Sequence, residues 1–291
     1  MNRILLVPHI SVLNANALSS PITVGFPAMT AWLGCMHALQ RKIVGTPGLE
    51  EISFTGMGVV NHSFTMKSYK DGGMYLSSLV GMGIPLNKKG ERSSFIEEAR
   101  CDLEVSLVIE VQNIHPVVKD EFENLVFKLL QGGMKIAGGD VIKLKKPTLV
   151  ALDDENSFIR FKRLLMPGYV LLERRYLMSE AMVEGMDGID ALLAFQKVYF
   201  NCSKKEPYVW EANRKTAGWI VPIATGFQGI SDEIVSSLQR DRSKKHYFAE
   251  SIVTVGEFVM PYRIKSVQEM LWSYHYDAKH DLYMCINEKI Q

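Results

Sequence analysis

The stretch CDLEVSLVIEV (residues 101–111) alternates between apolar and polar side chains. The apolar set comprises Leu103, Val105, Leu107, Ile109 and Val111, and the polar set Asp102, Glu104, Ser106 and Glu110. Successive side chains of a β-strand point to opposite faces, so the alternation predicts a strand that buries one face.

The segments on either side of this strand predict an alternation of strands and helices. In order they are strand 4–10, helix 27–43, strand 54–64, strand 101–111, helix 116–130 and strand 134–144, which is split by Gly138-Gly139. This β-α-β, excursion, β-α-β order is that of the split βαβ of ferredoxin-like and RNA-recognition folds. We therefore expect an α+β chain with such a palm.

The glycine-rich excursion at about 65–100 lies where such a fold can extrude a β-hairpin, a thumb whose tip would be NKKGERS (87–93). Beyond 150 the pattern predicts strands at 168–175, 218–227 and 250–260, and helices at 189–200 and 266–276. No Pro/Gly/Ser linker separates the halves. We expect one domain over 1–291, with the palm at about 1–150 and a C-terminal elaboration at about 151–291.

Composition sets the broad class of the protein. The chain has 291 residues, 47% of them hydrophobic, and a net charge of +1, so it can bury a large core but lacks the basic excess common in nucleic-acid binders. Charged residues are unevenly spread, which allows a locally basic groove. No apolar run reaches membrane-spanning length, and Cys35, Cys101, Cys202 and Cys285 stand singly. We expect a reduced, cytoplasmic protein with no membrane partner.

Motifs for enzymatic chemistry are absent from the sequence. It has no GxGxxG, P-loop, HExxH, CxxC or GxSxG, and we expect no cofactor and no metal. Asp102 and Glu104 have the spacing of a metal-binding carboxylate pair, but a polar strand face explains them better. A metal-independent ribonuclease using His37, His62 or His246 is a second hypothesis.

The connection SVLNANALSSPITVGFP (11–27) is much longer than the two to six residues usual between a strand and a helix. It is rich in side chains that both donate and accept hydrogen bonds, and apolar residues are interleaved among them. Long loops are either functional or disordered, and the apolar residues argue against disorder. We expect an ordered functional loop here.

The stretch NANALSSPITVGFPAMTAWLGCMHALQR (14–41) resembles the N-terminal signature of the second Csy protein of type I-F CRISPR surveillance complexes, a Cas-five-type RAMP subunit. The resemblance continues in order through GMGVVNHSF (56–64), IPLNKKG (84–90), EEARCDLEVSLVIEV (97–111), MKIAGGDVI (134–142), RLLMPGYVLL (163–172), GWIVPIATGF (218–227) and VGEFVMPYRIKSVQEMLWSYHY (255–276). It covers nearly the whole chain.

This resemblance implies a subunit without catalytic activity that has a RAMP palm and a hairpin thumb. It implies four partners: the five-prime handle of the CRISPR RNA, the large Csy subunit in a heterodimer, the backbone Csy subunit, and target DNA near the complex. Related subunits process CRISPR RNA in other subtypes. A CRISPR RNA-processing endoribonuclease is therefore the alternative.

Candidate RNA-binding residues follow from the chemistry of a single-stranded handle, which is read at exposed base edges and by stacking. Asn14 and Asn16 offer amides to bases, and Ser19 and Ser20 offer hydroxyls to sugar or phosphate; alternatively the asparagines only cap their own loop.

The other candidates would approach the phosphate backbone. Gly138 and Gly139, which follow Lys135, suggest a close approach of backbone to phosphate or else a β-bulge. The cations assigned to RNA binding are Lys135, Arg41 and, in the thumb, Lys88, Lys89 and Arg92, although the thumb cations also fit a solvated loop tip.

Overall fold

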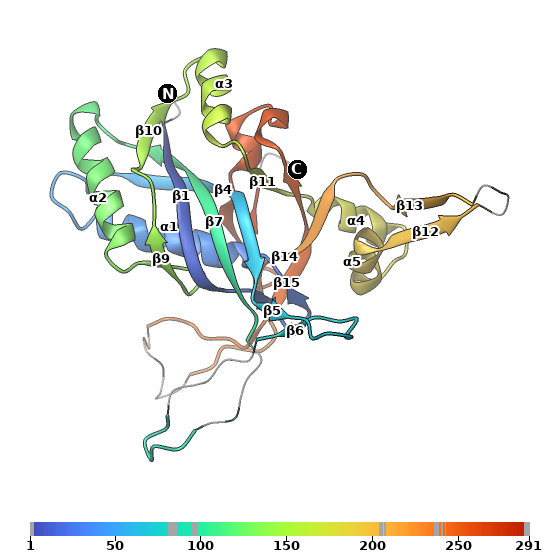
Figure 1. Ribbon diagram of the computed structural model, residues 1–291. Coiled ribbons are helices and arrows are strands. Elements are labelled where there is room, and N and C mark those ends of the chain that lie inside the picture. The colour runs from blue at the N-terminus through green and yellow to red at the C-terminus, as the bar shows by residue number, and fades with distance from the viewer. Residues whose placement is uncertain are drawn as a thin grey trace.

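The computed structural model describes residues 3–80, 86–92, 94, 98–203, 206, 208–235, 239, 241 and 243–287. Within these residues an antiparallel, curled sheet of eleven strands dominates a mixed α/β fold (Figure 1). Its order is β16-β17-β14-β15-β11-β4-β7-β1-β9-β8, and β10 also pairs with β1. Strands from both halves of the sequence thus form one sheet.

The N-terminal half follows the predicted order of elements. It contains β1 (Arg3–Asn16), α1 (Met29–Ile43), β4 (Ser53–Met66), β7 (Arg100–Gln112), α2 (Lys119–Gln131), β8 (Lys135–Ile136), β9 (Gly139–Lys143) and β10 (Thr148–Ala151). Short hairpins are formed by β2 (Leu18–Ser20) with β3 (Thr23–Val24) and by β5 (Ser68–Tyr69) with β6 (Ser78–Leu79). The predicted helices and the strands at 54–64 and 101–111 are confirmed.

The C-terminal half adds strands to one side of the sheet and helices around it. Its elements are α3 (Glu155–Leu164), β11 (Tyr169–Glu173), α4 (Arg175–Val183), α5 (Gly188–Gln196), β12 (Val198–Cys202), β13 (Trp210–Arg214), β14 (Trp219–Gly229), β15 (Ala249–Val259), β16 (Ser273–Asp277) and β17 (Leu282–Ile286). Strand β11 pairs with both β4 and β15, and so joins the two halves.

The alternation along β7 fills two separate cores. Leu103, Val105 and Leu107 are buried in the larger core, which also contains Trp32 of α1 and Phe122 of α2. On the opposite face, a smaller core contains side chains of β1, β7 and α3, among them Ile4, Val108 and Phe161. The sheet is therefore covered by α1 and α2 on one face and by α3 on the other.

The predicted loop at 11–27 is wrong over its first part, because β1 continues to Asn16. Ala15 and Asn16 still pair with Cys101 and Arg100 of β7. The β2–β3 hairpin then occupies most of the remaining connection. The polar composition of the segment predicted a loop, but pairing with β7 extends the strand and sets its register.

The predicted helix at 266–276 is also wrong. A 3-10 turn at Val267–Met270 precedes Trp272, whose backbone exchanges two hydrogen bonds of 2.9 Å with Met57. The buried indole of Trp272 donates to the Leu171 carbonyl oxygen at 3.1 Å. These contacts hold the chain extended, so the tyrosines that follow belong to β16.

Two further predicted elements change their form. The helix at 189–200 ends at Gln196, and the following residues form β12, which pairs with β13 in a ribbon that projects from the body (Figure 1). The split strand at 134–144 is a hairpin of β8 and β9. Its turn residues Ala137 and Gly138 have φ of 49° and 76°, as a two-residue turn with positive φ at both positions requires.

The predicted thumb falls partly outside the described residues, which omit 81–85, 93 and 95–97. The β5–β6 hairpin lies at its start, and a turn at 86–92 is described farther along. Among the helices of the described chain, none is both long and apolar enough to span a membrane.

The glycines of the strand predicted at 54–64 indicate either a bulge or the close approach of another backbone, and Gly58 of β4 shows the close approach. A Cβ at Gly58 would lie 2.9 Å from the carbonyl oxygen of Met270, whereas a Cβ at Gly34 in α1 would meet nothing within 4 Å. We expect Gly58→Ala to lower the free energy of unfolding by about 1–3 kcal/mol through overpacking. We expect Gly34→Ala to raise it by about 0.5–1 kcal/mol, because alanine is the better helix former.

Urea unfolding of both variants beside the parent protein measures the two effects. A Gly58→Ala protein as stable as the parent would contradict the tight contact between β4 and the 267–270 turn.

Candidate nucleic-acid interface

A groove of about 620 Å³ lies between the end of β1, the first turns of α1 and the β8–β9 turn. Four of the predicted RNA-binding residues line it, namely Asn16, Ser19, Lys135 and Gly138. They come from two stretches of sequence more than a hundred residues apart. The structure thus brings together the asparagine-serine segment and the Gly-Gly segment that the sequence singled out separately.

A bulge at Asn14 aims the end of β1 towards this groove. The register of β1 against β7 shifts between Val12 and Ala15, and Asn14 has a φ of 57°. The Asn14 N–H donates to Asp102 Oδ1 at 2.9 Å, and Lys67 Nζ donates to Asn14 Oδ1. Asparagine tolerates this left-handed backbone better than most residues, so Asn14 has a structural role beside the groove.

The side chains of Asn16, Ser19 and Ser20 organise their own turn. The Asn16 amide donates to the Leu18 carbonyl oxygen and accepts from the Leu18 N–H, both at 3.1 Å. Ser19 Oγ and Ser20 Oγ lie 2.9 Å and 2.6 Å from Thr23 Oγ1. Ser20 is buried, whereas Asn16 is exposed and its amide retains a second hydrogen and lone pairs for a ligand.

The β8–β9 hairpin forms the opposite wall. Its Ala137 carbonyl oxygen accepts from the Asn16 N–H at 2.8 Å. A Cβ at Gly139 would lie 2.7 Å from the Leu13 carbonyl oxygen, so Gly139 is explained by its contact with β1 and not by a ligand. Gly138 faces the groove, and Lys135 pairs with Asp140 at 2.6 Å on the exposed surface.

The N-terminus of α1 faces the same groove. Pro27, Ala28, Thr30 and Ala31 line it, and the residue before the helix, Ala28, has no side-chain group that could cap it. The first turn carries no acidic side chain. Free N–H groups and the helix dipole make such a terminus favourable for an anion. Small side chains on this face of α1 leave the groove open.

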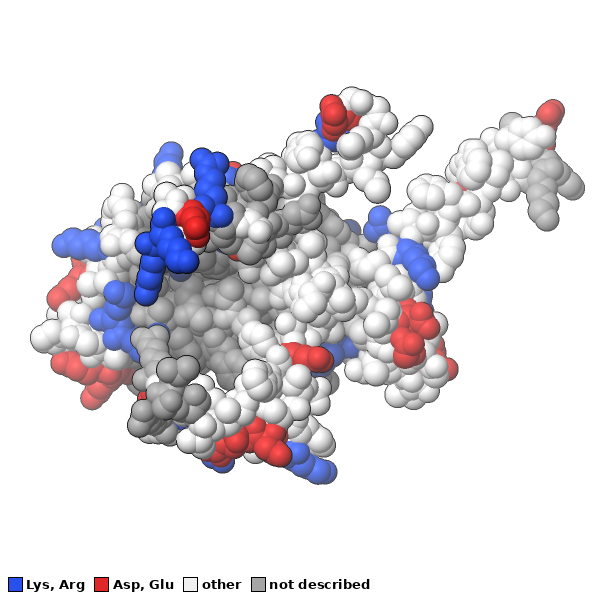
Figure 2. Space-filling view, turned by 90° about the horizontal axis from the view of Figure 1, so that it is seen from below, with Lys and Arg blue, Asp and Glu red and all other residues white. Residues whose placement is uncertain are grey.

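The remaining predicted cations lie away from the groove. Arg41 is exposed in the last turn of α1, and ten residues of helix, about 15 Å, separate it from Ala31. Lys88, Lys89 and Arg92 are exposed on the 86–92 turn, which lies at the lower end of the molecule in Figure 1. Lys and Arg side chains gather along one side of that lower face (Figure 2).

Two basic residues beside the groove were not predicted. Lys67 pairs with Asp102 at 3.2 Å, and Arg100 Nη1 donates to the Asn14 carbonyl oxygen at 3.4 Å while Nη2 pairs with Glu98. An Arg100 nitrogen is also the nearest atom to the Cβ position of Gly138, at 3.8 Å. Both residues sit at strand ends, so only the register of β4, β7 and β1 could have connected them with Asn14.

The carboxylates considered for metal binding are paired with cations or histidine. Asp102 contacts Lys67, and Glu104 lies 2.6 Å from His9 Nδ1, a hydrogen bond that lowers the pKa of Glu104. Within the described part of the chain, no group of three or more His, Cys, Asp or Glu could hold a metal ion. The carboxylates of this strand face therefore take part in contacts between strands.

His62, considered for ribonuclease chemistry, is held on both ring nitrogens. Nδ1 donates to the Pro167 carbonyl oxygen and Nε2 meets Ser106 Oγ, each at 2.6 Å, while His9 stacks on the ring at 4.4 Å. Burial lowers the pKa of His62 and favours its neutral form. Among the other candidates, His37 packs on Tyr274 with ring centroids 4.6 Å apart, and burial lowers its pKa too. His246 pairs through its backbone with Ile234.

Comparison of the sequence with known proteins shows the family of the chain. A family model described as CRISPR-associated protein (Cas_Csy2) matches residues 5–285. CRISPR-associated protein Csy2 of Pseudomonas aeruginosa (strain UCBPP-PA14) is 29% identical over 316 aligned positions, which cover 96% of this chain and 94% of that protein. The chain therefore belongs to the Csy2 family of CRISPR-associated proteins.

Proposed function

We propose that the chain is a non-catalytic subunit of a type I-F CRISPR RNA-guided surveillance complex in antiviral defence, and that its groove holds the five-prime handle of the CRISPR RNA. The observation that carries this proposal is the convergence of Asn16, Ser19, Lys135 and the uncapped α1 N-terminus on one groove. Membership of the Csy2 family supports the place in the complex.

The strand order supports a palm of the ferredoxin-like, RNA-recognition type. The strands β9, β1, β7 and β4 lie side by side in that order, and each pair is antiparallel. Helix α1 follows β1 and α2 follows β7, as in the split βαβ unit. In this proposal the excursion between β4 and β7 is the thumb.

The chemistry of the groove fits a single-stranded RNA. Polar amide and hydroxyl groups on one wall meet base edges or sugar, whereas Lys135 and the helix N-terminus meet phosphate. The thumb cations Lys88, Lys89 and Arg92 add contacts to the backbone without reading sequence. The handle is thus positioned by charge and recognised at the asparagine-serine wall.

The environment of His62 supports a non-catalytic role. A ribonuclease needs a base free to reach a 2′-hydroxyl, but both nitrogens of His62 are bonded within the protein. The processing-endoribonuclease alternative would therefore require this cluster to open. Site-specific cleavage of precursor CRISPR RNA by the purified chain, lost in His62→Asn, would favour that alternative.

The projecting β12–β13 ribbon supports a protein partner. Its Tyr199, Phe200 and Trp210 are 54%, 66% and 68% exposed, and the neighbouring Tyr208 is 66% exposed. An isolated two-stranded ribbon is marginally stable, and clustered exposed aromatic residues are typical of interfaces. We assign the ribbon to the heterodimer contact with the large Csy subunit. The backbone subunit then abuts another face.

Charge at the β8–β9 hairpin gives the first test of RNA binding. Lys135→Gln should weaken binding of a handle RNA and lower the slope of log Kd against log salt by about 1, because one phosphate contact is lost. Asp140→Asn should strengthen binding, since it removes the negative partner of Lys135. Fluorescence anisotropy titrations at several salt concentrations measure both effects.

Lys143→Gln is the matched control, because it removes the same charge from the end of β9 and Lys143 does not line the groove. Equal effects of Lys135→Gln and Lys143→Gln would show that net charge, and not the groove, determines affinity.

Recognition of bases gives the second test. Asn16→Ala should reduce the preference for the cognate handle over a scrambled one by about 1–3 kcal/mol, by analogy with bidentate base contacts elsewhere. Lys88→Gln with Lys89→Gln should instead weaken both RNAs alike, because these side chains contact phosphate. The ratio of the two dissociation constants separates the effects. Asn16→Ala protein that melts lower but keeps full preference would show that the asparagine only shapes its turn.

The ribbon gives a test of the protein partner. Phe200→Ser with Trp210→Ser should reduce the yield of heterodimer with the large Csy subunit at least tenfold on gel filtration, because aromatic anchors dominate interfaces. Phe248→Ser is the control, since Phe248 is 68% exposed but lies outside the ribbon. Undiminished heterodimer from the ribbon variant would exclude this contact.

A further inference from the structure

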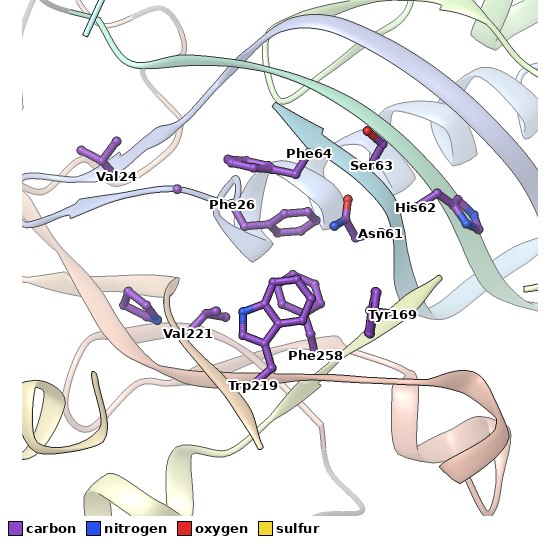
Figure 3. A pocket seen from close by; sticks show the side chains of 12 residues that line it. Val24, Phe26, Asn61, His62, Ser63, Phe64, Tyr169, Trp219, Val221 and Phe258 are labelled. Atoms are coloured by element: carbon purple, nitrogen blue, oxygen red, sulfur yellow. The ribbon is translucent and has the colours of Figure 1, made fainter. Parts of the chain in front are cut away.

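A second cavity, of about 370 Å³, opens on the face of the sheet that α1 and α2 cover and is walled by aromatic rings (Figure 3). The rings belong to Phe26, Phe64, Tyr169, Trp219 and Phe258. Its volume is within the range of about 300–1,000 Å³ that is usual for small-molecule pockets. Phe26 and Phe258 are buried, whereas Trp219 is 46% exposed at the rim. A planar ligand could therefore enter from solvent and meet ring surfaces inside.

The aromatic rings hold one another in place before any ligand is bound. Phe26 meets Phe258 edge-on at 5.3 Å, Phe258 meets Trp219 at 5.1 Å, and Trp219 meets Tyr169 edge-on at 5.0 Å. Edge-to-face contacts of this kind are favourable and fix ring orientation. The wall is thus preorganised for stacking.

Asn61 places a single amide in this apolar cavity. Its side chain reaches the space between the rings, while His62 turns away from it (Figure 3). The residue is 6% exposed, and its Oδ1 has no hydrogen-bond partner among the described residues. The register of β4 against β7 shifts between Asn61 and Ser63, so a bulge sets this orientation. An unpaired buried carbonyl oxygen is costly, which points to a ligand that supplies an N–H.

The cavity and the groove adjoin at the segment that leads into α1, and β14 contributes one residue to each. Val24, Gly25 and Phe26 line the cavity, and the next residues, Pro27 and Ala28, line the groove. Strand β14 contributes Trp219 to the cavity and Phe227 to the groove. An RNA strand that extends from the groove past Pro27 and Phe26 would reach the mouth of the cavity.

We infer that this cavity takes one unstacked nucleobase of the RNA bound in the groove, with Trp219 and its neighbours stacking on the ring and the Asn61 amide bonding its edge. The inference rests on the proposed function. A nucleobase has both a π-face and edge N–H groups, so it satisfies the rings and the amide together. An apolar side chain of a partner protein would leave the Asn61 oxygen unpaired.

The test is a scan of handle RNAs, each with one abasic position, titrated against the full chain. One position should cost about tenfold or more in Kd, and Asn61→Leu and Trp219→Ala should each lower affinity for the intact handle by a similar factor. In both variants the abasic substitution at that position should have little further effect. Asn61→Leu should melt no lower than the parent, because it removes an unpaired buried polar group.

Tyr262→Ala, which removes an exposed aromatic side chain next to α3 and away from the cavity, should leave the scan unchanged. In one outcome, the parent protein prefers the handle while Asn61→Leu and Trp219→Ala lose affinity at the same abasic positions as the parent does. That result would overturn the base pocket and leave the proposed function standing. A parent protein with no preference for the handle would overturn the proposed function and the pocket with it. Loss of heterodimer with intact RNA binding in Asn61→Leu would assign the cavity to a partner's side chain and overturn the inference.

Discussion

The contact of the β8–β9 hairpin with the bulged end of β1 determines the geometry of the groove. The backbones approach so closely that Gly139 has no room for a side chain, and the Asn16 N–H bonds to the Ala137 carbonyl oxygen at 2.8 Å. This contact holds Lys135 and Gly138 opposite the N-terminus of α1. Because β1 is the central strand between β7 and β9, both walls of the groove are anchored in the sheet.

The bulge at Asn14 connects the sheet with the polar wall. It redirects the chain after Leu13, and hydrogen bonds to Asp102 and Lys67 hold Asn14 in a left-handed conformation. The segment from Leu18 to Phe26 then separates the groove from the aromatic cavity, so one of its sides borders the polar groove and the other borders the cavity. In the proposed function, one face positions an RNA backbone while the other accepts a base.

Local periodicity was sufficient to predict the strands and helices that bury a regular face. The alternation in 101–111 and the helical spacing in 27–43 depend only on neighbouring residues, and both elements formed as expected. Elements determined by distant partners were not predictable in this way. Trp272 is extended because Met57 and Leu171 bind it, and the end of β1 is a strand because β7 pairs with it. The candidate site shows the same limit. The sequence indicated Asn16 and Lys135, but only the register of the sheet places them in one groove. The same register brings Lys67 and Arg100 beside that groove, which the sequence did not indicate.

The most direct test of the central claim is photo-crosslinking of handle RNA carrying 4-thiouridine to the complex, followed by mass spectrometry of the crosslinked peptides. The account predicts crosslinks in peptides of this chain that contain residues 14–41 and 135–140, the two walls of the groove. Crosslinks confined to the β12–β13 ribbon or to α3, with none in either wall, would contradict it.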